Sequence, residues 1–237
     1  MNKPLEGKTA LVTGSSRGVG RLIAKGLAEL GCSTVFCHGR TEGACEGVAL
    51  DVKNAGARAV IAAAELSKPD EVERLAQSIL ASGGVDILYN NAAVMHPWRE
   101  SVGELTMEDW AWSFQVNVFA PARLTAALLP PMIEKNWGRI VNLTSGIDKT
   151  PQLACYGASK HALDKWTDDL AAALAGTNVI ASLLDPGWLK TDLGGANADN
   201  EPETVLPGAL VPALLPDGSE SGRFFRAQEL RSFTLPE

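Results

Sequence analysis

The sequence has few cysteines and histidines, and they form no pattern that binds a metal or builds a disulfide framework. Among 237 residues there are 4 cysteines and 3 histidines. The cysteines, at positions 32, 37, 45 and 155, include no C-x-x-C pair and have no zinc-like spacing with the histidines. A chain of this length does not need disulfide bonds to build a core. We therefore expect no metal, reduced cysteines and a cytoplasmic location.

Long runs of basic or apolar residues are also absent. Lysine and arginine number 21 against 28 aspartates and glutamates, a net charge of −7, and no basic run occurs. Such a chain is a poor partner for nucleic acid. The longest apolar stretches, such as residues 59–64, fall far short of the roughly 20 residues that span a bilayer. The first eight residues lack the apolar segment of a signal peptide, so we expect no membrane segment.

What the sequence does contain is a regular alternation of strand-like and helix-like segments. Strands are expected at residues 9–13, 33–38, 58–62, 85–89, 139–143, 179–184 and around 224–225, and helices at 18–30, 42–55, from 69, 107–119, 120–136 and 155–175. This order predicts an α/β fold with a doubly wound parallel sheet, a Rossmann fold. No linker divides the series, so we expect a single domain over 1–237, with a flexible substrate-covering loop at about 188–220.

The first predicted strand ends in TGSSRGVG at residues 13–20, and a helix follows at once. Glycines at 14, 18 and 20 allow a tight turn whose backbone N–H groups can approach a pyrophosphate at the positive end of the helix. Three glycines alone could equally mark a structural turn. Their place between a strand and a helix favours a nucleotide site.

Six motifs occur in the order typical of one family: the glycine turn, Asn90-Asn91-Ala92-Ala93, Asn117, Ser145, Tyr156 with Lys160, and Pro186-Gly187 with Thr191. In this respect the chain resembles the short-chain dehydrogenases/reductases. The resemblance implies a nicotinamide cofactor. By resemblance the cofactor is held by Gly14, Ser16, Arg17, Gly18, Val19, Gly20, Arg40, Glu65, Leu66, Asn91, Tyr156, Lys160, Pro186, Gly187 and Thr191.

The cation pattern favours NADP(H) over NAD(H). Enzymes that select NAD place an acidic residue at the end of the second strand, where this chain has Gly39 followed by Arg40. Arg40 and Arg17 form an arginine pair, which in this family is associated with NADP(H). A guanidinium group binds a phosphate well. Two positions depart from the family pattern: Glu65 replaces an aspartate, and Ala93 replaces a glycine whose backbone could need a positive φ.

Tyr156 and Lys160 stand four residues apart, on one face of a predicted helix. A nearby ammonium is expected to lower the pKa of the tyrosine, which is about 10 when free. By resemblance Asn117 and Ser145 complete a catalytic set, with Asn117 holding a water that links Lys160 to solvent. NADPH would then deliver hydride to a ketone or aldehyde, Tyr156 would donate the proton, and Ser145 would bind the carbonyl oxygen.

Met95, His96, Trp98 and Trp188 are the expected substrate contacts, and they favour an apolar or aromatic substrate. Trp110 and Trp112 are expected in the core or at an interface. By resemblance the chain forms a homodimer or homotetramer through the helices at 107–136 and 155–175. Two alternatives remain open: an NADP-dependent alcohol dehydrogenase working in the oxidative direction, and a catalytically silent cofactor-sensing protein.

Overall fold

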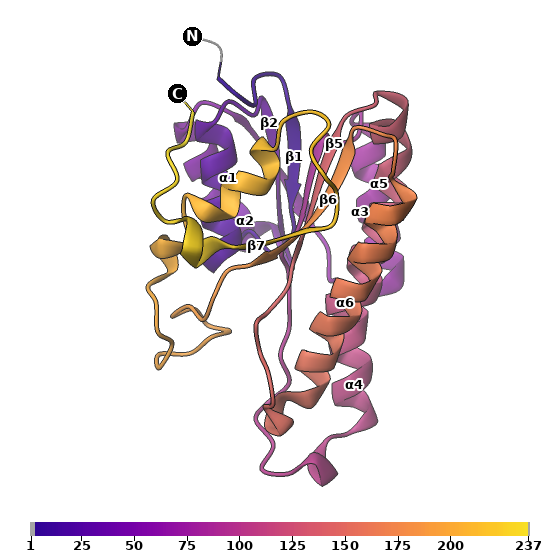
Figure 1. Ribbon diagram of the computed structural model, residues 1–237, viewed down its shortest axis with the longest axis vertical. Coiled ribbons are helices and arrows are strands. Elements are labelled where there is room, and N and C mark those ends of the chain that lie inside the picture. Colours follow the sequence, from indigo (N-terminus) through magenta and orange to yellow (C-terminus); the bar gives the residue numbers. More distant parts are fainter. Residues whose placement is uncertain (1–2, 237) are drawn as a thin grey trace.

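The computed structural model describes residues 3–236 and contains a seven-stranded sheet with helices on both faces (Figure 1). The strand order is β3-β2-β1-β4-β5-β6-β7, and every neighbouring pair is parallel. The predicted single-domain, doubly wound α/β fold is therefore confirmed.

The strands are β1 (Thr9–Val12), β2 (Thr34–Gly39), β3 (Arg58–Ala63), β4 (Ile87–Asn90), β5 (Gly138–Leu143), β6 (Val179–Asp185) and β7 (Arg223–Arg226). The α-helices are α1 (Gly18–Glu29), α2 (Glu42–Asn54), α3 (Pro69–Ala81), α4 (Met107–Phe114), α5 (Ala120–Glu134) and α6 (Ala154–Ala173). Each lies within a few residues of its predicted range.

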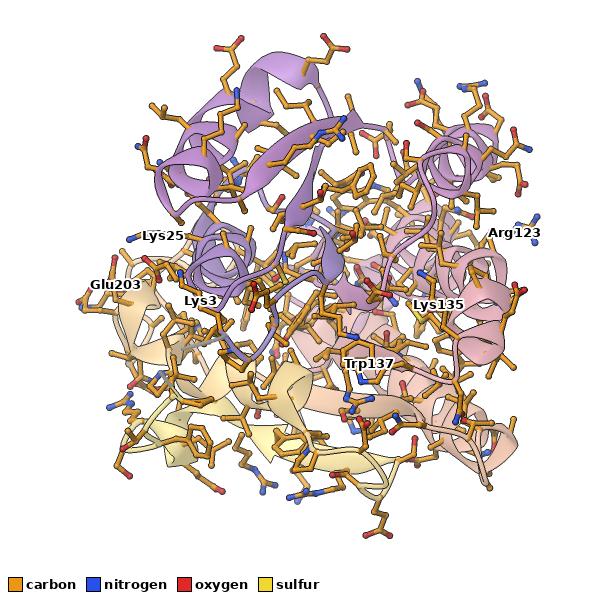
Figure 2. The ribbon with its side chains drawn as sticks, turned by 90° about the horizontal axis from the view of Figure 1, so that it is seen from above. Lys3, Lys25, Arg123, Lys135, Trp137 and Glu203 are labelled. Atoms are coloured by element: carbon orange, nitrogen blue, oxygen red, sulfur yellow. The ribbon has the colours of Figure 1, made fainter. Side chains whose placement is uncertain are left out.

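Alternation along the strands divides the core into two layers. In β1, Ala10 and Val12 face one cluster of buried apolar residues, whereas Leu11 faces the other. The first cluster includes α1 and α2, and the second includes α3 and α5. Figure 2 shows Lys25 of α1 and Arg123 of α5 on opposite sides of the molecule, because these helices cover opposite faces of the sheet.

The two helices predicted at 107–119 and 120–136 form one continuous helical run, Met107–Glu134. A π-helical turn, Gln115–Phe119, joins α4 to α5, and α5 continues through Pro130 and Pro131 to its last residue. By length and composition this run could cross a membrane, and half of its most apolar window is buried inside the protein. Helices that pack on the sheet of a soluble protein meet the same criterion.

The segment after β6 differs from the predicted loop. Residues 202–205 and 208–214 form short 3₁₀ helices, η4 and η5, and Val205, Leu210 and Ala213 are buried in the core beside α1. The Tyr89 hydroxyl of β4 donates a hydrogen bond of 2.9 Å to the Ala209 carbonyl. Residues 205–215 of the expected covering loop thus belong to the core, because their apolar side chains close the sheet face that α1 leaves uncovered.

The strand order reverses between β1 and β4, which are neighbours at the centre of the sheet. The chain leaves β1 toward β2 and β3 on one side, and β4 toward β5, β6 and β7 on the other. In open parallel sheets a crevice forms at this switch point, outside the carboxyl ends of the strands. The fold therefore places a cleft beside residues 13–20.

We expect Tyr89→Phe to destabilise the fold, because it leaves the buried Ala209 carbonyl without a donor. A loss of about 1–3 kcal/mol in the free energy of unfolding is expected, measured by urea denaturation. The control is Tyr156→Phe, the same change at the only other tyrosine, whose hydroxyl forms no comparable bond to the core backbone. Equal losses in the two variants would contradict this role for Tyr89.

Candidate active site

A large cleft of about 1670 Å³ opens along the carboxyl ends of β1, β2, β4, β5 and β6. A drug-sized ligand typically occupies a pocket of roughly 300–1,000 Å³, so this cleft has room for a dinucleotide and a second molecule. Every predicted cofactor-binding residue lines it: Gly14, Ser16, Arg17, Gly18, Val19, Gly20, Arg40, Glu65, Leu66, Asn91, Tyr156, Lys160, Pro186, Gly187 and Thr191.

The turn after β1 is a cradle that has no room for a side chain at Gly14 or Gly20. Gly14 and Gly18 have φ of 63° and 55°, conformations that L-residues rarely adopt. A Cβ at Gly20 would stand 2.5 Å from the Gly14 carbonyl oxygen, and one at Gly14 would stand 2.8 Å from the Cα of Ala92. The turn leads directly into the N-terminus of α1, where backbone N–H groups favour an anion. These features fit the pyrophosphate of a dinucleotide.

Thr13 and Asn91 connect this turn to the end of β4. The Thr13 hydroxyl accepts hydrogen bonds of 3.0 Å from the N–H groups of both Asn91 and Ala92. The Asn91 side-chain amide donates to the carbonyls of Thr13 and Gly14, at 2.7 and 3.2 Å. Asn91 therefore holds the shape of the cradle from behind, a role that the resemblance did not specify.

His38, which the sequence analysis did not select, holds the same turn from the β2 side. The Gly14 N–H donates to His38 Nδ1 at 3.0 Å, and His38 Nε2 lies 3.1 Å from the Ala64 carbonyl. These partners require a neutral ring with its proton on Nε2. Burial lowers the pKa of His38 to about 4, which keeps the ring neutral. Only the fold reveals this role, since its partners lie 24 and 26 residues away.

The two predicted cations, Arg17 and Arg40, both line the cleft. Arg17 forms an ion pair of 2.7 Å with Asp192, and about two-thirds of each side chain is exposed. Gly39 leaves no space for the acidic residue that selects NAD, because a Cβ there would lie 2.7 Å from Cys45 Sγ. The site end of β2 thus presents a cation and no carboxylate.

The two departures from the family pattern have simple structural outcomes. One carboxylate oxygen of Glu65 accepts a hydrogen bond of 3.0 Å from the Ser67 N–H, so Glu65 is folded onto its own turn. Ala93 is not among the residues with positive φ, which in the described chain are glycines apart from Asn136 and Lys149. The alanine is therefore accommodated without backbone strain.

Tyr156, Lys160 and Ser145 all line the cleft. Lys160 Nζ lies 5.8 Å from the centroid of the Tyr156 ring and donates a 2.7 Å hydrogen bond to the Leu143 carbonyl. Burial raises the pKa of Tyr156 to about 12; the Ser145 side chain acts in the opposite direction, without the geometry of a full hydrogen bond. Burial also lowers the pKa of Lys160 to about 8. Desolvation dominates at Tyr156, so its pKa is raised although Lys160 was expected to lower it.

Asn117 does not line the cleft with the other three residues. It lies buried in the π-helical turn, where its Oδ1 accepts from the Val94 N–H at 2.8 Å. Its Nδ2 donates to the Val94 carbonyl and to the Ser159 hydroxyl, each at 2.9 Å. The Asn117 side chain therefore anchors the irregular segment that follows β4 to α6, beside Lys160.

The segment after β6 closes one wall of the cleft. Gly187 has a φ of 81°, and its N–H donates to Asp185 Oδ1 at 2.9 Å. Gln228 donates to the Pro186 carbonyl at 2.8 Å, and a Cβ at Gly187 would lie 2.7 Å from Gln228 Cγ. The Thr191 hydroxyl accepts from the Gly194 N–H at 3.2 Å. These contacts define a compact wall at residues 186–195.

Three of the four predicted substrate contacts, Met95, Trp98 and Trp188, line the mouth of the cleft. Trp112, expected in the core or at an interface, joins them with 40% of its surface exposed. The prediction for His96 was wrong: its side chain is buried outside the cleft and its Nδ1 lies 2.8 Å from the Pro97 carbonyl. Among residues 3–236, no group of three or more His, Cys, Asp or Glu is placed to bind a metal.

The fold and the cleft together define a protein of the Rossmann type, with a cleft at the switch point suited to a dinucleotide. Comparison with known proteins identifies the family. The pattern of the short chain dehydrogenases matches residues 8–202, and the chain belongs to this family.

Relatives of known name span most of the chain. The chain is 36% identical over 195 residues, 80% of its length, to a short chain dehydrogenase of Pseudocercospora fijiensis, of which the match spans 62%. It is 36% identical to the D-beta-hydroxybutyrate dehydrogenase of Cupriavidus necator, covering 98% of this chain and 90% of that protein. A solved landomycin C-6 ketoreductase with bound NADP and rabelomycin superimposes with a TM-score of 0.80, at 31% identity, covering 94% of this chain and 96% of the other.

We expect the free energy of unfolding to depend on His38 at acidic pH. The pKa of His38 is about 4 in the folded protein and about 6.5 in an unfolded chain, so the unfolded state binds the proton first as pH falls. The full stability is present above about pH 6.5 and is lost as the pH falls toward 4, by about 2 kcal/mol between pH 7 and pH 5. His38→Gln should reduce this loss in urea denaturation.

The matched control is His161→Gln, because His161 is exposed on α6. That variant should keep the pH dependence of the natural protein. If His38→Gln also kept it, the buried neutral state assigned to His38 would be incorrect.

Proposed function

We propose that this protein reduces a ketone or an aldehyde to an alcohol with NADP(H). The observation that carries the proposal is that Tyr156, Lys160 and Ser145 line the same cleft as the glycine cradle. A Rossmann cleft supplies only cofactor binding. A hydroxyl donor and a lysine at its centre supply the groups for chemistry at a carbonyl.

The chain's own residues account for the proton and for the charge on the substrate. When bound, the nicotinamide supplies or accepts a hydride. Tyr156 is a neutral phenol at physiological pH, since its pKa is raised to about 12, and this is the form that donates a proton to a carbonyl oxygen. Ser145 donates a hydrogen bond to the same oxygen as it becomes negative. A neutral Tyr156 can serve as the proton donor in reduction, and the reverse oxidation would use the same groups.

NADP(H) is the proposed cofactor because Arg40 follows the end of β2 in place of an acidic residue, and Arg17 stands in the turn, where its ion pair with Asp192 is largely exposed. Arg40 and Arg17 both line the cleft and can bind a ribose phosphate. The position of the NAD-selecting acid is Gly39, where a larger residue would contact Cys45. The NADP bound to the ketoreductase named above is consistent with this choice.

The proposed substrate is an apolar or aromatic carbonyl compound. Trp98, Trp112 and Trp188 line the mouth of the cleft with 56%, 40% and 52% of their surfaces exposed. Exposed indole rings stack on aromatic molecules and bury large apolar areas. Leu153 and Leu193 also line the cleft and extend this apolar rim.

We also propose a homodimer or homotetramer in the cytoplasm, with no nucleic-acid or membrane partner. Met107, Phe119 and Ile133 of the helical run 107–134 are exposed, at 75%, 55% and 40%, and a second copy would cover them. All four cysteines are free, as in a reducing compartment.

Turnover and its dependence on Tyr156 test the proposal directly. The natural protein should oxidise NADPH with apolar and aromatic ketones or aldehydes, and NADH more slowly. Tyr156→Phe should reduce kcat by about 10²–10⁴-fold, because the proton donor is lost. NADPH binding, measured by calorimetry, should persist. Tyr89→Phe is the matched control and should keep turnover, and near-native turnover in Tyr156→Phe would refute the assigned role.

Cofactor choice tests the arginine site. Arg40→Asp should shift the ratio of kcat/KM for NADPH over NADH toward NADH by about tenfold or more, because a charged hydrogen bond is lost and a repulsive charge is gained. The control is Arg58→Asp, an exposed arginine at the opposite end of the sheet, where β3 begins. An unchanged ratio in Arg40→Asp would exclude Arg40 from cofactor selection.

A further inference from the structure

A second acidic group stands directly beyond the site along α6. Tyr156, Lys160 and Asp164 are spaced four residues apart, so they occupy successive turns on one helix face. Lys160 therefore lies between the tyrosine and a carboxylate. Nothing in the proposed reaction uses Asp164.

Asp164 is not an ordinary surface carboxylate. Its Oδ1 is buried and accepts no hydrogen bond from any of residues 3–236. The buried hydroxyl of Thr144, at the end of β5, also has no hydrogen-bond partner in the described chain. Thr144 faces Asp164 and lowers the pKa of its carboxyl, without the geometry of a full hydrogen bond. Asp164 is half-buried as a whole, and a carboxylate oxygen that is buried without a hydrogen-bond donor is stabilised by a nearby positive charge.

Lys160 is a buried cation, so it needs a nearby negative charge. Its side chain is almost fully buried, at 2% exposure, and its ammonium has one hydrogen bond in the described chain, to the Leu143 carbonyl. Burial alone lowers the pKa of Lys160, and the charge of Asp164 acts to raise it. No carboxylate of residues 3–236 forms a direct ion pair with Lys160 within 4.0 Å. Asp164 is thus the negative charge that this cation senses.

The other charges around this pair are few. On α6, His161 and Lys160 lower the pKa of Asp164, whereas Asp168 raises it. From β5 the facing group is the neutral Thr144. At the end of β6, Asp185 acts on Tyr156 and raises its pKa.

We propose that Asp164 is a positioning residue whose carboxylate keeps Lys160 protonated beside Tyr156. Its effect on the charge of Lys160 does not depend on the proposed function, because it is argued from the spacing on α6, the burial of Lys160 and the unpartnered oxygen of Asp164. Its effect on turnover rests on the proposed function, because only there does the charge of Lys160 act on the proton donor.

The direction of the effect follows from charge. The Asp164 carboxylate counteracts the lowering of the Lys160 pKa by burial. Without that carboxylate, the pKa of Lys160 falls below its value of about 8. A larger share of Lys160 is then neutral at pH 7 to 8. The loss of activity at alkaline pH should move to lower pH, while KM for the cofactor should change less than kcat.

The first experiment measures the pKa of Lys160 without any substrate. Lysine labelled with ¹³C at Cε is followed by NMR through a pH titration, and Lys160→Arg identifies the Lys160 signal. Asp164→Asn should lower the midpoint of that signal by about one pH unit. Asp164→Glu, which retains the charge, should restore it. The control is Asp168→Asn, because Asp168 is exposed one turn further along α6.

A second measurement does not depend on how well Asp164→Asn folds. Electrostatic coupling is reciprocal, so removal of the lysine charge must raise the pKa of Asp164 by a similar amount. Lys160→Met should therefore raise the midpoint of the Asp164 carboxyl signal by about one pH unit. Carboxyl ¹³C labelling of aspartate gives this value.

The outcomes separate the two claims. If neither midpoint moves, Asp164 is not the counter-charge of Lys160 and the inference is overturned, whatever the turnover. If both midpoints move and the natural protein reduces no carbonyl compound, the inference stands and the proposed function fails. The inference and the proposed function are both supported if three results coincide. Both midpoints move, the natural protein reduces a carbonyl compound, and the loss of activity at alkaline pH shifts in Asp164→Asn but not in Asp168→Asn.

Discussion

The site depends on the close approach between the turn after β1 and the end of β4. No Cβ fits at Gly14, where it would lie 2.8 Å from the Ala92 Cα, or at Gly20, where it would lie 2.5 Å from the Gly14 carbonyl oxygen and against the Asn91 side-chain amide. Such compression places several backbone carbonyl and N–H groups in a small volume, and each of them needs a partner. Thr13, Asn91 and His38 supply these partners from β1, β4 and β2. The shape of the cradle is therefore a property of three adjacent strands as much as of the glycines.

A second network of hydrogen bonds, on the other side of the switch point, positions Lys160 relative to Tyr156. Asn117 connects Val94 to Ser159, and Lys160 follows Ser159 on α6 and reaches the Leu143 carbonyl of β5. The π-helical turn allows this, because it widens the helix at the point where Asn117 faces inward. Disturbance at any of these groups would move Lys160 relative to Tyr156. Rigidity at the centre of the cleft thus comes from buried hydrogen bonds between β5, α6 and the π-helical turn.

Local signals in the sequence predicted the fold and most of the cleft. Strand-helix alternation depends on neighbours in sequence and placed each strand, and the glycine turn together with the family resemblance selected fifteen residues that all line the cleft. Features set by distant contacts could not be predicted in this way. Val205 and Leu210 look like loop residues in a glycine- and proline-rich segment, yet they cover α1. His96 looks like a site residue by its position, and His38 does not, because only the packing of the strands determines which ring faces the turn.

The pKa shifts at the centre of the cleft share one cause. Removal from water penalises whichever form is charged, so burial raises the pKa of the Tyr156 phenol and lowers that of the Lys160 ammonium. The same environment would strongly resist a negative oxygen on a substrate unless a donor were already in place. A protonated Tyr156 and the Ser145 hydroxyl are such donors. A buried site of this kind is therefore suited to creating an alcohol from a carbonyl, provided that the charge of Lys160 is maintained by a partner within the fold.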